Sequence, residues 1–475
     1  MSSTYNKKLI TTLLLAGSFI AILNQTLMIT AIPPIMNEMN ISPNSAQWLT
    51  TVFMLVSGIM IPISAFFIEK FTTRQLFIAA MGIFSVGTIV CALAPNFGTL
   101  IAGRIIQSAG AGVMLPLMQT VFLLVYPRNK RGAAMGLVGL VISFAPAIGP
   151  ALSGFIMIHF SWRVLFYIIL PIALLSIVIS IFKLQNVTDL KNPKVDILSV
   201  IFSSFGFGGL LYGFTAVGNY GWSNWLTIMS LSIGIITLCL FIFRQFVLEN
   251  PMLEFRVFKY KIFTLTTILG MIVFMGLIGS ETLIPLYMQD MRSFTPFEAG
   301  LAILPGALVS GFMSPITGKI FDKVGARWLS IIGLAIIMVT TIPFSFLNEV
   351  TSFAYITIFF AIRMFGLSMV MMPTTTAGLN ELPNHLIPHG TAMTNTMRQV
   401  AASIGTAILV TVMTTTSHVA TNVSNPDIHG VNVAFMVITI TSLIGLIIAC
   451  FVTNPAHDHH EEDTEITISI EKNPQ

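Results

Sequence analysis

Long apolar runs recur along the whole chain, and each is long enough to cross a lipid bilayer. A membrane-spanning helix needs about 20 mostly apolar residues. Applied to this sequence, that length predicts spans at 9–31, 46–68, 75–94, 99–124, 131–158, 161–183, 197–217, 225–246, 261–289, 298–320, 328–347, 353–379, 390–417 and 432–453. With 55% hydrophobic and 9% charged residues, the chain is too apolar to be a soluble protein. We therefore predict an all-α polytopic membrane protein with fourteen transmembrane helices.

Lysine and arginine are distributed unequally between the predicted loops. Most lie in segments on the side of the two termini, whereas Arg163 and Arg292 lie in loops on the opposite side. Because loops rich in lysine and arginine stay in the cytoplasm, we expect a multi-pass protein of a bacterial cell membrane with both termini cytoplasmic. The net charge of +4 arises from these loops, so we expect no nucleic-acid partner.

One loop sequence occurs twice. Residues 65–74 read AFFIEKFTTR and residues 318–327 read GKIFDKVGAR, a displacement of 322 − 69 = 253 positions. The repeat predicts two six-helix bundles with a helix pair inserted between them. The predicted units are the first bundle at 1–183, the inserted pair with its connectors at 184–260, the second bundle at 261–453 and a cytoplasmic tail at 454–475. A duplicated bundle of this kind places its binding site between the halves, near the middle of the membrane.

The repeated loop carries charges that can lock a gate. An acid at the end of one helix, beside basic residues in a tight turn, can pair with a neighbouring helix and hold one conformation. The alternative is a solvated charged turn, but two copies in matching register favour gating. The candidates are Glu69 and Arg74 in the first copy and Gly318, Asp322, Gly325 and Arg327 in the second.

The predicted span at 131–158 is unusually rich in glycine and proline and carries no charge after its first residue. Small residues let two helices approach closely, and proline leaves carbonyl groups unbonded that only a protein interior tolerates. Ordinary close packing explains a single glycine, whereas the whole run favours a contact that seals or slides. The candidates are Pro146, Gly149, Pro150, Ser153 and Gly154.

The segment Gly149-Pro150-x-x-Ser153-Gly154 resembles the antiporter motif of major facilitator drug exporters, with Ser153 where a second glycine is usual. The loop from Gly318 to Arg327 resembles the loop signature of the same superfamily. From about residue 10 to about residue 453, the order and spacing of such motifs are similar to the EmrB/QacA type of drug:proton antiporter, and most to its LmrB and LmrS branch. The resemblance implies a major facilitator fold with two inserted helices and proton-coupled export by alternating access.

A charged side chain inside a bilayer is costly, so each one needs an explanation. Glu281 lies within the 261–289 span, and a carboxyl group in an apolar cavity can bind and release a proton near physiological pH. The alternative is a solvated acid in an outer vestibule. The resemblance associates Arg104 with proton transfer, and the alternative is a structural arginine bonded to backbone carbonyls. We assign proton coupling to Glu281 and Arg104.

The drug-binding region should be apolar and adaptable, because methionine and aromatic walls repack around different ligands. Asn24 stands where fourteen-helix exporters often carry an aspartate, so it cannot titrate, although it can hydrogen-bond a drug. Most methionines and phenylalanines in such a chain face lipid or other helices, so the candidates define only a region. They are Asn24, Gln25, Gln107, Met114, Phe144, Phe274, Tyr287, Arg363 and Met371.

These observations predict a monomeric multidrug efflux antiporter whose partners are lipophilic drugs, protons and membrane lipids. The proton is the coupling ion, and we expect no cofactor or metal because the three cysteines lie in apolar runs without motif spacing. The same scaffold could instead export an endogenous metabolite, lipid or peptide. An enzyme is disfavoured because the chain lacks a nucleophile–base set or a phosphate-binding loop. A sensor is disfavoured because no soluble output domain is predicted.

Overall fold

The computed structural model describes residues 6–188, 190–191, 196–420 and 423–453. Within these residues, fourteen helices are long and apolar enough to cross a membrane, and no strand occurs. The helices are α1 (Lys7–Met39), α2 (Pro43–Lys70), α3 (Thr73–Ala92), α4 (Phe97–Val125), α5 (Arg131–His159), α6 (Arg163–Lys183), α7 (Ile197–Tyr220), α8 (Trp225–Val247), α9 (Lys261–Leu286), α10 (Pro296–Val324), α11 (Ala326–Thr341), α12 (Phe353–Asn380), α13 (Ile387–Val419) and α14 (Pro426–Cys450). The predicted fold class is confirmed, and each predicted span overlaps one of these helices.

Local sequence signals fix the ends of several helices. Thr72 and Gln75 form a capping box at the start of α3, in which each side chain bonds the other residue's backbone N–H. Thr295 and Glu298 do the same at the start of α10. Gly325 ends α10 with a φ of 82°, a conformation that glycine adopts at little cost. The sharp turn into α11 therefore depends on this glycine of the repeated loop.

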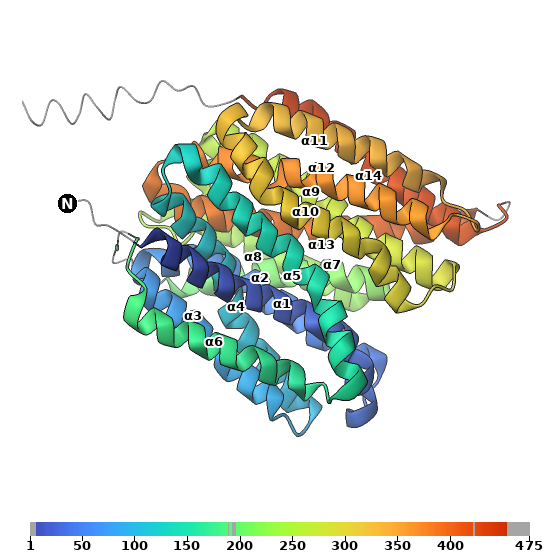
Figure 1. Cartoon of the computed structure of the whole chain (residues 1–475), viewed down its shortest axis with the longest axis horizontal. Helices are drawn as coiled ribbons and strands as arrows, with labels where there is room; N and C mark the ends of the chain where they lie inside the picture. Colours follow the sequence, from blue (N-terminus) through green and yellow to red (C-terminus); the bar gives the residue numbers. More distant parts are fainter. Residues whose placement is uncertain (1–5, 189, 192–195, 421–422, 454–475) are drawn as a thin grey trace, which may run out of the picture.

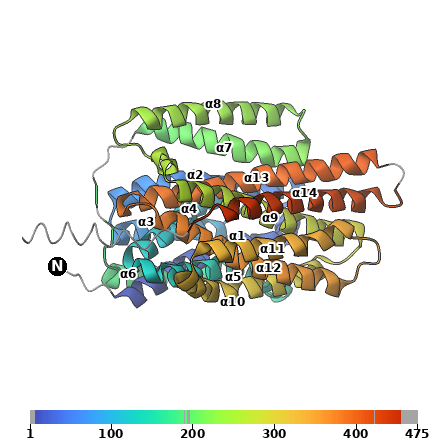
Figure 2. The same ribbon diagram turned by 90° about the horizontal axis from the view of Figure 1, so that it is seen from above.

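The helices form two six-helix bundles and a separate hairpin. Helices α1–α6 make one bundle, α9–α14 make the other, and α7 packs along α8 (Figure 1, Figure 2). The hairpin lies on one flank, where α7 contacts α2 of the first bundle and α13 of the second (Figure 2). Trp48 of α2 stacks on Tyr212 of α7, and the Trp222 indole N–H donates to the Thr411 hydroxyl of α13 at 2.9 Å. The residue limits that the sequence suggested for these units stay a prediction.

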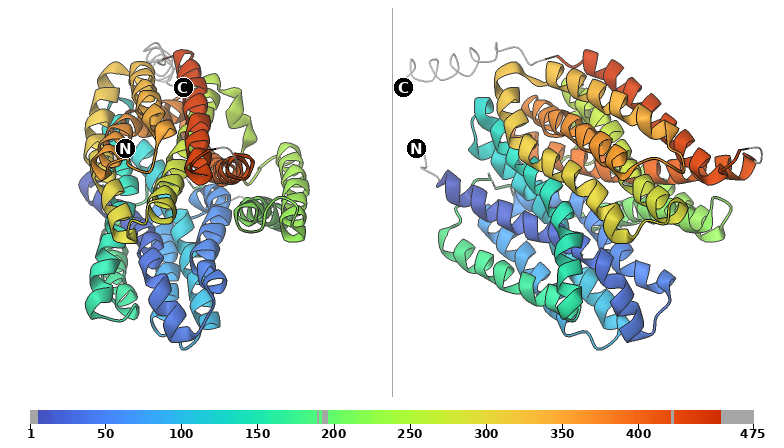
Figure 3. Two further views of the ribbon diagram at one scale, coloured as in Figure 1. Left: turned by 90° about the vertical axis from the view of Figure 1, so that its right-hand side faces the viewer. Right: turned by 45° about the vertical axis from the view of Figure 1, so that its right-hand side comes forward.

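The start of α1 and the end of α14 lie at the same end of the molecule, which we call the terminal side (Figure 1, Figure 3). Opposite it is the distal side. The two bundles touch through α5 and α10 on the terminal side, where a Cβ added to Gly136 would lie 2.7 Å from the Cα of Pro315. Toward the distal ends of the same helices, Phe155 is 63% exposed and Phe297 is 71% exposed. The two bundles thus lie against each other through α5 and α10 on the terminal side and diverge toward the distal side (Figure 1).

Candidate functional site

A buried polar cluster in the first bundle is centred on Arg104 of α4, which has no exposed surface. Its Nη1 donates to Asn24 Oδ1 of α1 at 2.6 Å and to Gln107 Oε1 at 2.7 Å, and its Nε donates to the Leu49 carbonyl of α2 at 3.1 Å. The guanidinium carbon lies 4.2 Å from the centre of the Phe53 ring. Three predicted site residues therefore meet here, and the arginine ties α1, α2 and α4 together.

Two predicted substrate-binding residues, Asn24 and Gln107, belong to this cluster. The side-chain oxygens of Asn24 and Gln107 accept from Arg104, and the Gln107 amide donates to Thr88 Oγ1 at 2.8 Å. Both side chains are buried, whereas the neighbouring Gln25 is half-buried. One guanidinium nitrogen of Arg104, Nη2, has no hydrogen-bond partner among the described residues. Such an orphaned donor gives the cluster capacity for one more polar contact.

Arg363 of α12 occupies the related position in the second bundle and is also buried. Its Nη2 donates to the Gly276 carbonyl of α9 at 2.8 Å, and its Nε donates to the Thr341 hydroxyl of α11 at 3.2 Å. Glu281 of α9 lies near enough to interact with Arg363 electrostatically, although the described residues show no ion pair between them. The predicted proton-coupling acid is thus within electrostatic range of Arg363, the repeat partner of Arg104.

Glu281 continues an inward-facing stripe of α9. Thr267, Gly270 and Leu277, which precede it at helical spacing on the same face, are buried, and Phe274 is half-buried. A Cβ added to Gly270 would lie 3.2 Å from Nε of a buried arginine of α13, which shows that this face points into the protein. The Glu281 side chain is nevertheless exposed. Glu281 thus combines an accessible surface with a position on the helix face that points into the second bundle.

The second copy of the repeated loop hydrogen-bonds to the first bundle, and we call this contact a clasp. Asp322 at the end of α10 accepts hydrogen bonds from the backbone N–H groups of Gly132 (2.7 Å) and Ala133 (2.8 Å) at the start of α5. A helix N-terminus carries a partial positive charge, so this carboxylate both satisfies two free N–H groups and complements the dipole. Gly318, one turn earlier, allows this approach because its Cα faces the Gly132 backbone. Arg327 is exposed at the start of α11.

The first copy makes a related clasp with different partners. Glu69 at the end of α2 is 3.2 Å from Nε2 of His389 at the start of α13, and it also pairs with Lys191 of the 184–196 connector. His389 Nδ1 in turn accepts from the backbone N–H of Glu254, in the connector that follows α8, at 3.3 Å. Both connectors of the inserted hairpin therefore contact the Glu69–His389 pair. Arg74, by contrast, is exposed and lines a groove on the outside of the bundle.

The glycine- and proline-rich helix α5 uses its two halves differently. Its first half seals against α10, where Phe144 meets Phe312 with ring centroids 5.6 Å apart. Its second half packs on α1: Gly149 lies against Thr26, and the Ser153 hydroxyl hydrogen-bonds the Thr30 hydroxyl. The other members of the motif, Pro146, Pro150 and Gly154, are half-buried. The predicted close contact exists, and the motif residues themselves make it with α1.

The remaining substrate candidates have contacts in different parts of the fold. Met114 is buried against Gly17 of α1, and Met371 is buried where its carbonyl accepts from Arg398 at 3.2 Å. Tyr287 is buried at the distal end of α9, where its hydroxyl donates to the Asn348 carbonyl at 2.6 Å. Phe144 and Phe274 are half-buried. Phe274, on the stripe that leads to Glu281, is therefore the aromatic candidate best placed to face the space between the bundles.

Three polar contacts between the bundles were not anticipated. Arg131 donates to Asn380 Oδ1 at 2.9 Å, and Asn395 donates to Gln119 Oε1 at 2.6 Å. The third is the pairing of His389 with Glu69. For the contacts of Arg131 and His389 the sequence repeat offers a signal. It aligns Gly132 with Gly390, so Arg131 and His389 hold equivalent positions directly before the two glycines. No sequence signal pairs Gln119 with Asn395.

Comparison with known proteins agrees with this architecture. Residues 14–406 match the family model of the Major Facilitator Superfamily. The chain is 57% identical to the uncharacterized MFS-type transporter YcnB of Bacillus subtilis, over 95% of this chain and 96% of that protein. It is 43% identical to the lincomycin resistance protein LmrB of the same organism, over 94% of this chain and 96% of that protein.

More distant matches extend the comparison. The multidrug export protein EmrB of Haemophilus influenzae is 28% identical, over 84% of this chain and 79% of that protein. The crystal structure of the human organic anion transporter MFSD10 superposes with a TM-score of 0.66 at 11% identity, over 94% of this chain and 99% of that one. The expected likeness to the EmrB/QacA type and its LmrB branch is confirmed by these relatives. The chain belongs to the Major Facilitator Superfamily.

Proposed function

We propose that this transporter is a proton-coupled efflux antiporter for lipophilic antibiotics and other toxic compounds, working by alternating access. The observation that carries the proposal is Glu281, an acid on the inward stripe of α9 that lies within electrostatic range of Arg363 and has an exposed surface. The relatives named for lincomycin resistance and multidrug export support drugs as the cargo. We place the terminal side in the cytoplasm of a bacterial cell, with a monomer in the cell membrane.

In this proposal the described state is the one that loads protons. With the terminal side closed by Asp322 and by Glu69, Glu281 exchanges protons with the distal, extracellular side. Binding a proton removes its negative charge beside Arg363 and so changes the balance between the two conformations. When the terminal side opens, Glu281 releases the proton to the cytoplasm and a drug takes its place. The proton is the coupling ion, and no cofactor is needed.

Arg104 has a supporting role in this cycle. Its guanidinium joins α1, α2 and α4 through Asn24, Leu49 and Gln107, so these three helices move together. Nη2 of Arg104 has no partner among the described residues and is available to a drug or to a water molecule during transport. In this proposal Asn24 acts by holding Arg104, and its contact with cargo is indirect.

The test is drug-induced proton movement in inside-out vesicles, with a lincosamide, a phenicol, a fluoroquinolone and a dye. The wild type should exchange protons for at least one drug, and Glu281→Gln should bind that drug without exchange. Glu298→Gln is the matched control, because Glu298 is also a distal-side carboxylate and glutamine keeps its capping box. Normal coupled transport by Glu281→Gln would remove Glu281 from the mechanism. Absence of exchange with every compound in the wild type would reject efflux coupling altogether.

A further inference from the structure

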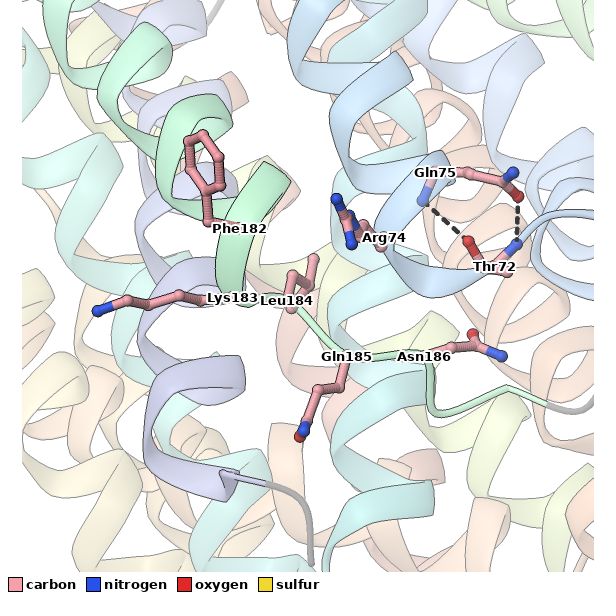
Figure 4. A pocket seen from close by; sticks show the side chains of 8 residues that line it. All are labelled: Thr72, Arg74, Gln75, Phe182, Lys183, Leu184, Gln185 and Asn186. Carbon is pink, nitrogen blue, oxygen red and sulfur yellow. Dashed lines mark hydrogen bonds between the residues drawn. The ribbon is translucent and has the colours of Figure 1, made fainter. Parts of the chain in front are cut away.

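A groove of about 710 Å³ lies on the outer surface of the first bundle, at its terminal side. It is formed where α3 begins, at Thr72 and Arg74, and where α6 ends, at Phe182 and Lys183 (Figure 4). Figure 4 shows the Arg74 guanidinium projecting into the space beside the end of α6, while the Lys183 side chain extends away from it. Arg74 is thus the central cation of this groove, and Lys183 adds positive charge at its rim.

The lining offers hydrogen-bond donors, because its amide oxygens are already occupied. Gln75 Oε1 accepts from the Thr72 backbone N–H at 3.2 Å, and Asn186 Oδ1 accepts from the Thr73 backbone N–H at 2.9 Å. Gln185 Oε1 accepts from the Asn6 backbone N–H at 3.2 Å. The described lining contains no carboxylate, and Arg74 makes no salt bridge with a described residue. A groove with two cations, spare side-chain amide donors and no carboxylate in its described lining attracts an anion that accepts several hydrogen bonds.

The position of the groove indicates that this anion belongs to a lipid. It lies at the ends of two membrane-spanning helices, and Phe182 on its lip is 78% exposed. Farther along the same helices, Val178 of α6 and Val86 of α3 are also exposed, so an apolar surface continues from the groove into the membrane. Basic pockets between transmembrane helices bind the head groups of anionic lipids in this way.

The corresponding place in the second bundle is built differently. There α11 begins beside Arg327, and α14 ends in Cys450, followed by Phe451 and Val452. Val452 is buried against Ala326 and Leu329, and Phe451 is exposed. Among the residues described at the end of α14, no cation takes the place of Lys183. The groove with two cations is therefore a property of the first bundle and is absent from the described part of its repeat partner.

We infer that the groove between α3 and α6 binds the phosphate of an anionic phospholipid, with Arg74 as its direct ligand. The phosphate oxygens accept from the Arg74 guanidinium and from the side-chain amides of Gln75 and Gln185, Lys183 supplies further attraction, and the acyl chains lie along the apolar faces of α3 and α6. The segment that lines the groove continues from Gln185 to Lys191, which pairs with Glu69. A bound lipid would therefore restrain the start of the connector whose Lys191 pairs with Glu69.

The test measures binding of phosphatidylglycerol to the purified full-length transporter by native mass spectrometry. Arg74→Gln/Lys183→Gln should weaken this binding roughly 20- to 30-fold, because each cation near a membrane surface contributes about one fivefold step. Lys323→Gln/Arg327→Gln is the matched control in the repeated loop and should bind as the wild type does. Zwitterionic phosphatidylethanolamine should bind far more weakly than phosphatidylglycerol. Equal phosphatidylglycerol binding by wild type and Arg74→Gln/Lys183→Gln would overturn the inference.

Two further measurements keep the result unambiguous. If inorganic phosphate binds the wild type and phosphatidylglycerol does not, the groove is a site for free phosphate and the lipid assignment is wrong. A photoactivatable phosphatidylglycerol analogue should crosslink to wild-type peptides that contain residues 72–75 or 182–186. Crosslinks confined to other peptides would also overturn the inference, and this measurement needs no variant to fold.

Discussion

Replacing Asp322 by asparagine should shift the transporter away from the state closed on the terminal side. The two carboxylate oxygens accept from the backbone N–H groups of Gly132 and Ala133 at 2.7 and 2.8 Å. A hydrogen bond to a charged group is worth about 1.5–3 kcal/mol, and the charge at a helix N-terminus adds about 0.3–1 kcal/mol. Asparagine keeps one acceptor oxygen and loses the other acceptor and the charge. The expected loss is about 2–3 kcal/mol, or roughly 30- to 140-fold in the conformational equilibrium.

The shift can be measured as a distance between spin labels on the distal side. Labels at Phe160, just after α5, and at Phe297 in α10 report how far the two bundles are separated there, after replacement of the three native cysteines. The wild type should show mainly the long distance, and Asp322→Asn should gain a large population at a shorter one. Asp290→Asn makes the same chemical change at an exposed distal residue and should leave the distances unchanged. An unaltered distribution in Asp322→Asn would refute the assignment of Asp322 as a clasp.

Three further outcomes follow. Gly318→Ala should destabilise the terminal-side contact by about 1–3 kcal/mol, because its Cβ would lie 2.9 Å from the Gly132 carbonyl carbon. It should therefore change the same label distances. Gly300→Ala, with no described atom within 4 Å of the added Cβ, should leave them unchanged. Lys191→Ala should change the conformational equilibrium less than about fivefold, since half-exposed ion pairs contribute at most about 1 kcal/mol. An effect as large as that of Asp322→Asn would contradict this ranking. The hydrogen bond from Arg244 lowers the pKa of Asp196 to about 2 from its usual 3.8, so this pair should stabilise the α7–α8 hairpin fully above pH 3.8. After correction for the intrinsic pH dependence of exchange, the protection of the hairpin amides should fall as the pH falls toward 2 in the wild type, and an identical loss of protection in Asp196→Asn would exclude the ion pair as the cause.

The spans were predictable because a bilayer sets one length for every helix, and that length is visible as an apolar run. Their ends were less so: α1 was expected at 9–31 and extends over Lys7–Met39, since the helix continues past Pro33 and Pro34 beyond the apolar run. The repeat predicted Asp322 and Glu69 as gate residues, because both copies keep an acid at the same place. Both acids contact the other bundle, and their role in gating stays a prediction. These predictions depend on patterns within a single segment.

Contacts between segments were beyond the sequence. Asn24 was expected to face cargo, but it is the nearest acceptor for Arg104, and helical periodicity does not reveal which neighbouring helix a polar side chain meets. Likewise, nothing near Glu69 in the sequence indicates that its partner is His389, 320 positions later. Such pairs are fixed by how the two bundles meet, which depends on the shapes of all the helices together.

The inserted hairpin makes the two flanks of the transporter unequal. Helix α7 covers the seam between α2 and α13, while the seam between α5 and α10 lies on the opposite flank (Figure 2). Near the distal end of α5, on the flank without the hairpin, Phe155 and Ile158 are largely exposed. We expect a lipophilic solute that diffuses in the plane of the bilayer to meet the inserted helices on one flank and the apolar side chains of α5 on the other.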